Sequence, residues 1–227
     1  MSLWLVVPVK SLRDGKSRLA PALDAQQRRA FVERLLVRTL DRAARFPGLE
    51  RTLVVSACSE ARAQASACGA TVIEEHSPGG LNNALRQAQL ALTDAGVTQM
   101  LMVSSDLPLL QPEDLQCLAA ASSGGAIAIA PDRARQGTNG IGLHAATEFD
   151  FSFGPNSFQR HLERAQQFDV DSAIVERTGL AFDVDLPNDL AELRAVEQRH
   201  KHCASLLAGL AWQGNPTAAD LRRRRSV

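Results

Sequence analysis

The chain has 227 residues, with 25 basic and 25 acidic side chains and a formal net charge of zero. This balance argues against a nucleic-acid binder, which usually gathers a basic excess on one face, and aromatic residues at 4% leave little for stacking on bases. The apolar run at residues 3–9 is too short for a signal segment, and no apolar stretch approaches the length of a membrane span. The four cysteines form no CxxC pair, which favours reduced side chains in a cytoplasmic protein over a zinc site or a disulfide frame.

Strand and helix patterns alternate through the first half of the chain. The continuous apolar run Leu3–Val9 is typical of a central strand that is covered on both faces. Asp24 is the expected N-cap of a long helix whose apolar residues recur at helical spacing as far as Ala43. Beyond these two elements, we expect strands at Thr52–Ser56, Ala70–Ile73 and Met100–Val103 and helices at Glu60–Ala67 and Leu81–Asp94.

The second half continues the alternation. Pro112 stands at a helix start, where proline is tolerated. The further predicted elements are strands at Ala126–Ala130, Gly140–Leu143, Ala173–Val175 and Leu180–Val184 and helices at Asn156–Gln167 and Pro187–His200. This order predicts a three-layer α/β/α Rossmann-like fold with a mostly parallel sheet and a small antiparallel excursion within residues 138–175. We expect a single domain over residues 1–202, followed by a mobile, arginine-rich tail over residues 203–227.

The first candidate site follows the first strand, because ligands of open α/β sheets bind outside the carboxyl ends of the strands. The segment KSLRDGKSR places Lys10, Arg13, Lys16 and Arg18 around one glycine. Fixed cations at a strand end suit a triphosphate, whereas a solvated basic loop is an equally good interpretation of this segment alone. Neither GxGxxG nor GxxxxGK[ST] is present, which disfavours a dinucleotide dehydrogenase and a Walker-type NTPase.

Carboxylates close two other predicted strands. Asp106 follows Met100–Val103 in the segment SSDLP, and Asp183 and Asp185 lie two residues apart in FDVDLP. A period of two places Asp183 and Asp185 on the same side of an extended segment. Three carboxylates at neighbouring strand ends are the oxygen-rich set that Mg²⁺ prefers. Each aspartate could instead cap the following helix, but two strand ends with the same Asp-Leu-Pro pattern favour metal.

Two glycine-containing loops and an asparagine complete the candidates. The loop GTNG contains Thr138, and FGPNS ends at Ser157, where a helix N-terminus would offer backbone N–H groups to an anion. The alternative is an ordinary helix start. Asn82, in GLNN, could face a base or ribose or only cap its helix. The histidines show no metal spacing that suits a site, and no Ser-His-Asp arrangement can be argued.

Taken in order, these segments resemble the 2-phospholactate guanylyltransferase family of F-420 deazaflavin coenzyme biosynthesis, itself similar to the molybdopterin-type nucleotidyltransferases. The resemblance runs from residue 4 to about residue 196 and includes PVKSLRDGKSRLAP, GLNNAL, SSDLPLL, GTNG, FGPNSFQRHL and FDVDLPNDL. Each motif is weak alone, but six in the same order are specific. The resemblance implies a nucleotidyltransferase fold and an Mg²⁺-dependent enzyme that takes GTP and a small phosphorylated acid.

The resemblance also implies roles for individual residues. Lys16 and Arg18 would hold the departing pyrophosphate, and Asp106 would serve catalysis as well as the metal. The implied metal ligands are Asp106, Asp183 and Asp185. The implied nucleotide contacts are Lys16, Arg18, Gly80 and Asn82, to which we add Lys10 from the basic loop. The implied contacts to the acid's phosphate are Thr138, Gly154 and Ser157.

The acceptor remains open among 2-phospholactate, phosphoenolpyruvate and 3-phosphoglycerate. His144 follows GTNGIGL, so we expect its side chain near the acid, where an imidazole donor would favour an acceptor with a hydroxyl group. A half-exposed strand histidine without a ligand is an equal alternative. Other hypotheses are a nucleotidyltransferase for a sugar phosphate or a pterin, and a non-catalytic nucleotide-binding protein. The sequence is also compatible with a homodimer.

Overall fold

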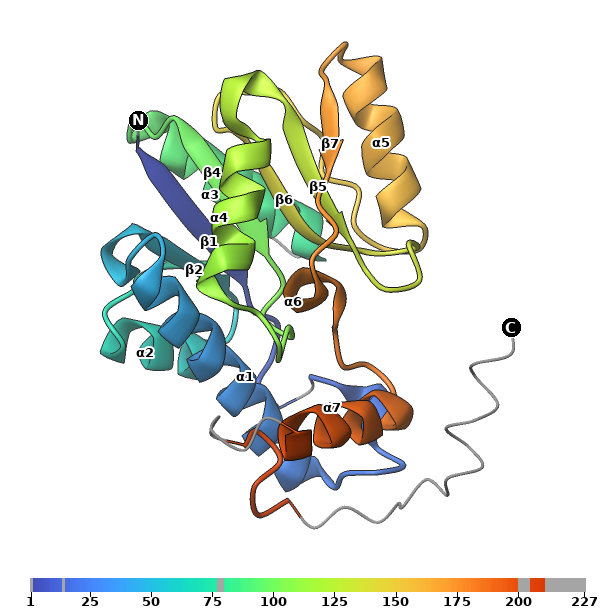
Figure 1. The fold of residues 1–227 in the computed structure, drawn as a ribbon. Helices are drawn as coiled ribbons and strands as arrows, with labels where there is room; N and C mark the ends of the chain where they lie inside the picture. The colour runs from blue at the N-terminus through green and yellow to red at the C-terminus, as the bar shows by residue number, and fades with distance from the viewer. Residues whose placement is uncertain (1, 14, 77–79, 200–204, 211–227) are drawn as a thin grey trace.

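A computed structural model describes residues 2–13, 15–76, 80–199 and 205–210. Its centre is a seven-stranded sheet with the order β3-β2-β1-β4-β6-β5-β7 (Figure 1). Strand β6 pairs antiparallel with β4 and β5, and all other neighbouring strands are parallel. The fold class is therefore confirmed, and the antiparallel excursion is β6 alone. The strands are β1 (Leu3–Pro8), β2 (Thr52–Ser56), β3 (Thr71–Glu74), β4 (Gln99–Val103), β5 (Ile127–Pro131), β6 (Thr138–His144) and β7 (Ser172–Ile174).

Helices cover both faces of this sheet (Figure 1). Asp24 is the N-cap of the longest helix, as expected, and its side chain accepts a hydrogen bond from the backbone N–H of Gln27 in a capping box. The helices are α1 (Ala25–Arg45), α2 (Ser59–Ala67), α3 (Gly80–Asp94), α4 (Pro112–Ala121), α5 (Ser157–Gln167), α6 (Thr178–Ala181) and α7 (Pro187–Arg199). Within the described residues, no helix has the length and apolar character needed to cross a membrane.

Alternating side chains of the strands form two separate cores. On β1, Leu5 and Val7 face the cluster that includes residues of α1, α2 and α4, whereas Val6 faces the cluster that includes residues of α3 and α5. On β4, Leu101 and Met102 divide between the two faces in the same way. Burial on both faces explains why these strands are continuously apolar.

A third apolar cluster lies beyond the carboxyl ends of the strands and fixes the chain segments there. It joins Leu19 from the loop after β1, Phe31 from α1 and Leu190 from α7. Phe182 and Val184 are buried in this cluster, so the alternating Asp183 and Asp185 point away from it. The packing thus holds the FDVDLP segment against the basic loop.

One expectation about the end of the chain needs correction. Leu180–Val184 was expected to be a strand, but residues 178–181 form the short helix α6, and the following segment pairs with no described strand. Its apolar residues are buried in loop and helix packing, which periodicity alone does not distinguish from a sheet. Within residues 205–210 of the expected tail, Leu206 is buried in the third cluster and its carbonyl accepts a bond of 2.8 Å from Arg34, whereas Ser205, Ala208 and Gly209 are exposed. Residues 203–204 and 211–227 lie outside the described residues.

Candidate active site

Lys16 lies at the centre of the residues that gather at the carboxyl ends of β1 and β4. It precedes a short 3-10 helix (Ser17–Leu19) and adopts a left-handed backbone conformation with φ of 58°. Leu19 is buried in the third cluster and so anchors this turn. The Lys16 side chain is only 10% exposed, and its ammonium donates to the carboxylates of Asp106 and Asp185, the latter at 2.5 Å. Loops 90 and 169 residues away in sequence therefore meet at one nitrogen atom.

The neighbouring carboxylates explain why Lys16 is protonated although it is buried. Burial alone would favour the neutral amine, but Asp106 and Asp185 outweigh it and raise the pKa of Lys16 above its usual range. Burial would likewise raise the pKa of Asp185, but Lys16 dominates and lowers it. Arg18 adds a longer contact of 3.9 Å to Asp185 and is itself largely exposed. Lys16 is thus a fixed buried cation between two carboxylates.

Asp183 completes the group of three predicted carboxylates. Burial first, and then the neighbouring charge of Asp106, raise the pKa of Asp183 to about 6. Asp185 contributes in the same direction. Carboxyl groups perturbed by burial and by neighbouring carboxylates are found preferentially at functional sites. The structure therefore brings Asp106, Asp183 and Asp185 into one electrostatic group.

The donor set suits a divalent ion of the Mg²⁺ type. Asp106 Oδ1 is buried, and in the described part of the chain it has no hydrogen-bond partner, although buried carboxylate oxygens normally have one. Oxygen ligands are what Mg²⁺ prefers, and it binds through one or two carboxylates together with substrate phosphates. The described residues contain no preassembled cluster of three or more His, Cys, Asp or Glu side chains around a metal position. The fit therefore rests on the buried Asp106 Oδ1, which has no partner among the described residues, and on the neighbouring carboxylate of Asp183.

The alternative role of these aspartates as helix caps is not what the structure shows. Helix α4 has Gln111 as its N-cap, five residues after Asp106. At α7, the side chain of Asp189 accepts the backbone N–H groups of Asp185 and Leu186 at 2.9 and 2.7 Å. The carboxylates of Asp106 and Asp185 thus bond to Lys16 and do not cap a helix.

The other cations of the basic loop occupy different positions. Lys10 is exposed, and its charge contributes to lowering the pKa of Asp185. Arg13 instead forms an ion pair of 2.6 Å with Glu60 of α2. Lys10, Lys16 and Arg18 therefore surround the carboxylates, whereas Arg13 contacts the neighbouring helix.

The predicted acid-binding residues gather at the same edge of the sheet. Thr138 is buried and begins β6, whose antiparallel register places Gly140 opposite Val103 at the end of β4. The backbone N–H of Ser104 donates to the carbonyl of Asn139 at 2.9 Å, which ties the GTNG loop to the segment that leads to Asp106. Thr138 thus lies at the same edge of the sheet as the carboxyl end of β4, because β6 runs antiparallel to β4.

Gly154 and Ser157 form the start of α5. Ser157 is buried as the first residue of this helix, and its N-cap is Asn156 in the left-handed conformation. Gly154 has φ of +124°, which side chains rarely adopt, and an added Cβ would lie 3.2 Å from the Arg160 guanidinium. The helix N-terminus and Arg160 together favour an anion at this loop.

Asn82 lies beside this loop and is fully engaged with it. Its side-chain amide donates to the carbonyl of Phe153 at 3.3 Å, and its side-chain oxygen accepts from the backbone N–H of Phe153 at 2.7 Å. Gly80 is the first residue of the same helix, α3, and has φ of +68°. Asn82 therefore positions the loop before α5, a role that the sequence pattern did not indicate.

The expected role of His144 is wrong. His144 is the last residue of β6 and pairs with Gln99 at the beginning of β4, whereas Thr138 is the first. Six residues of extended chain separate these ends by about 20 Å. The imidazole is exposed and accepts a bond of 3.3 Å from the backbone N–H of Ala146. The antiparallel direction of β6, which local sequence does not reveal, carries His144 away from the site.

Another histidine, His161, for which the sequence predicted no role, lies instead beside Thr138 and the loop before α5. It is fully buried in α5, and its ring contacts Phe149 and Phe153. Nδ1 lies 2.9 Å from the hydroxyl of Thr138, and Nε2 accepts the backbone N–H of Ser152 at 2.9 Å. The helical spacing of Phe158, His161 and Ala165 marks His161 as facing the core and could have identified it.

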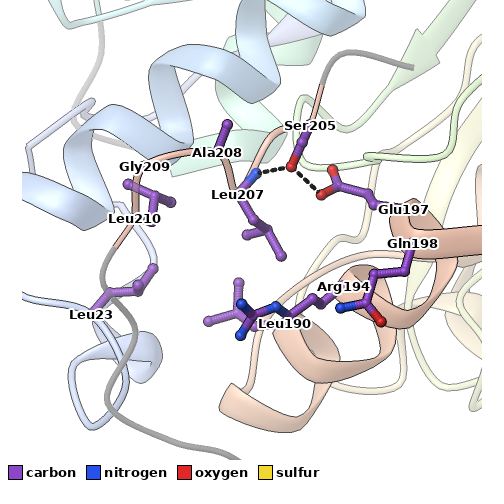
Figure 2. Close-up of a pocket in the computed structure, with 10 residues that line it drawn as sticks. All are labelled: Leu23, Leu190, Arg194, Glu197, Gln198, Ser205, Leu207, Ala208, Gly209 and Leu210. Carbon is purple, nitrogen blue, oxygen red and sulfur yellow. Dashed lines mark hydrogen bonds between the residues drawn. The ribbon is translucent and has the colours of Figure 1, made fainter. Parts of the chain in front are cut away.

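A separate cavity of about 350 Å³ lies between α7, Leu23 and residues 205–210 (Figure 2). Leu190 and Leu207 give it apolar walls, and the Ser205 hydroxyl bonds to Glu197 at its rim (Figure 2). Asp106, Asp183 and Asp185 are not among its lining residues. The chemistry-bearing side chains are therefore not in this cavity but at the open edge of the sheet.

A mostly parallel sheet with a basic loop, clustered carboxylates and a helix start at its carboxyl edge is the arrangement of a nucleotidyltransferase fold. The model of the family described as "Guanylyl transferase CofC like" matches residues 3–226. The chain belongs to this family of guanylyltransferases, which serves F-420 biosynthesis. The match extends past residue 196, where the motif resemblance ended.

Individual proteins show the same relationship. The chain is 40% identical to a phosphoenolpyruvate guanylyltransferase of Rubrobacter xylanophilus, over 86% of this chain and 95% of that protein. It is 34% identical to the protein of the same name from Conexibacter woesei, over 86% and 89% of the two chains. Among solved structures, a putative nucleotide-diphospho-sugar transferase from Desulfovibrio desulfuricans has a TM-score of 0.72 at 16% identity, covering 99% and 96% of the chains. That similarity supports the fold alone.

Proposed function

We propose that this guanylyltransferase transfers GMP from GTP to phosphoenolpyruvate in an Mg²⁺-dependent reaction. The observation that carries the proposal is the buried Lys16 ammonium held between Asp106 and Asp185 beside Asp183. The choice of acceptor follows the names of the relatives, which are 40% and 34% identical to this chain. We expect slower transfer to 2-phospholactate and to 3-phosphoglycerate.

In the proposed reaction, a phosphate oxygen of the acid forms a bond to the α-phosphorus of GTP. The bond from the α-phosphorus to the bridging oxygen of the β-phosphate breaks, and its electron pair leaves with pyrophosphate. Both reactants are anions, so cations must offset their repulsion. A phosphate monoester is already ionised near neutral pH, so no general base is required.

The proposed metal ligands are Asp106 and Asp183, with Asp185 alongside. A divalent ion bound there would supply positive charge where the reacting phosphates meet. Lys16 already holds Asp106 and Asp185 in place and would orient them toward the nucleotide. Lys10 and Arg18 are more exposed, so their side chains are free to contact the triphosphate as it binds and the pyrophosphate as it leaves.

The proposed acid site comprises Thr138, Gly154 and Ser157. At the first turn of α5, the backbone N–H groups of Ser157 and Phe158 donate to the carbonyls of Gly154 and Gln136. The dipole of the helix still favours an anion at this end. The buried Ser157 hydroxyl adds a donor at this helix start. Arg160 lies close enough to Gly154 to add positive charge.

The direct test is pyrophosphate release by the purified protein with each of the four nucleoside triphosphates and a panel of phosphorylated acids and sugar phosphates. We expect release only with GTP and a phosphorylated acid, fastest with phosphoenolpyruvate, and none after removal of divalent metal. Faster release with a sugar phosphate, or full activity in excess chelator, would contradict the proposal. Nucleotide binding without release with any acceptor would favour a non-catalytic binding protein.

Ser157→Ala is expected to raise the KM for the acid about tenfold and to leave the KM for GTP unchanged. The physical reason is that a hydrogen bond to a charged group contributes roughly 1.5–3 kcal/mol. Initial rates at varied acid and at varied GTP separate the two constants. Ser66→Ala, an exposed hydroxyl deletion on α2, is the matched control. An equal rise in both KM values would contradict a separate acid site.

A further inference from the structure

The hydrogen bonds of His161 define which of its nitrogens carries the proton. The backbone N–H of Ser152 can only donate, so Nε2, 2.9 Å away, must be the bare acceptor nitrogen. Burial, and secondarily the charge of Arg160, lower the pKa of His161 to about 3, so the ring is neutral at physiological pH. A neutral imidazole with bare Nε2 carries its proton on Nδ1.

This tautomer determines what the Thr138 hydroxyl can do. Nδ1–H lies 2.9 Å from Thr138 Oγ1 and donates to it, so the oxygen is an acceptor in this contact. The hydroxyl proton of Thr138 is then directed to another acceptor. With the opposite tautomer, the hydroxyl would donate to His161 and would offer only lone pairs, which an anionic phosphate repels.

We propose that His161 is a positioning residue that directs the Thr138 hydroxyl to donate to the phosphate or carboxylate of the bound acid. This inference rests on the proposed function, since it assigns the acid to Thr138. His161 also ties the start of β6 to the loop before α5, through Thr138 on one ring nitrogen and Ser152 on the other. The two segments that form the acid site are thereby linked through one rigid buried ring.

A double-mutant cycle tests the coupling between the two residues. Thr138→Val removes the hydroxyl, and His161→Phe keeps an aromatic ring without a donor. We expect each to raise the KM for the acid about three- to tenfold with the KM for GTP unchanged. Because His161→Phe also loses the Ser152 contact, we expect the double variant to raise that KM by clearly less than the product of the two single effects. If His161→Phe raises that KM by the same factor with and without the Thr138 hydroxyl, the proposal is overturned.

A conservative replacement of His161 keeps the test informative if His161→Phe fails to fold. His161→Asn places an amide N–H where Nδ1–H lies and is expected to restore the KM for the acid at least partly toward the wild-type value. The exposed His144→Leu is the matched control and should leave both KM values unchanged. A His161→Asn variant that folds, as judged by its thermal unfolding, but binds the acid no better than His161→Phe would contradict the directing role.

The tautomer itself can be measured on the wild-type protein without any activity. In ¹⁵N-labelled protein, long-range ¹H–¹⁵N spectra should show one histidine with protonated Nδ1 and bare Nε2 that does not titrate between pH 5 and 8. The loss of that signal in a His161 variant assigns it. Protonated Nε2, or titration in this range, overturns the proposal. Because this result does not depend on turnover, a wild-type protein inactive toward every acid would contradict the proposed function and leave the proton assignment standing.

Discussion

Asp106→Asn is expected to reduce pyrophosphate release at least about 100-fold while the protein stays folded. The variant loses the charge of a carboxylate whose Oδ2 bonds to Lys16 and whose buried Oδ1 has no partner among the residues that the structure describes. Losses of this size are typical when one electrostatic stabiliser is removed from a catalytic site. The amide can still accept a hydrogen bond from Lys16, and Lys16 keeps its bond to Asp185. The fold should therefore persist.

The measurement is kcat as a function of Mg²⁺ concentration, with thermal unfolding as the check on folding. Asp94→Asn makes the same charge change at an exposed position at the end of α3 and should leave turnover unchanged. If the Asp106 variant regains wild-type turnover at saturating Mg²⁺, the carboxylate only improves metal affinity. Wild-type turnover of the variant at every Mg²⁺ concentration would show that Asp106 has no role in catalysis or in metal binding.

Much of the carboxylate cluster could be predicted from the sequence, because the patterns that indicate it are local. To predict that Asp106, Asp183 and Asp185 belong to a site, it is enough to assign the extended segment before each of them. The rule that ligands bind at the carboxyl ends of strands supplies the rest. The alternation in FDVDLP held even though the segment forms no strand, because Phe182 and Val184 are buried in the third cluster. Burial of every second residue, and not sheet pairing, turns both aspartates to the same side.

The errors arose where a role depends on long-range geometry. His144 was misplaced because nothing local indicates that β6 runs antiparallel to β4. His161 was passed over because a search for metal spacing does not detect a neutral buried ring that bonds to Thr138, 23 residues away. Lys16 was expected to contact a triphosphate, but the structure adds two carboxylate partners that the sequence pattern did not connect with it. No pattern in a single sequence contains those contacts.

Lys16→Met is expected both to abolish detectable turnover and to destabilise the protein in the absence of metal. Met fills nearly the same volume but removes the cation between Asp106 and Asp185. Breaking a fully buried ion pair costs about 3–5 kcal/mol, and here we expect about 1–3 kcal/mol because the Asp185 side chain is 43% exposed to screening water. Urea unfolding at pH 7.5 measures this loss directly. Turnover should fall at least about 100-fold, because the charged carboxylates that Lys16 holds in place would lose their fixed orientation.

Mg²⁺ distinguishes the electrostatic explanation from a packing defect. If the variant is unstable because three carboxylates lack a cation, added Mg²⁺ should raise its free energy of unfolding more than it raises that of the wild type. A packing defect would leave the difference between the two proteins unchanged by Mg²⁺. Lys10→Met is the matched control, because Lys10 is exposed, and its loss should change stability by less than about 0.5 kcal/mol. If Lys16→Met is as stable as the wild type without metal, the ammonium does not hold the carboxylates together, and the proposed role of Lys16 in orienting them fails.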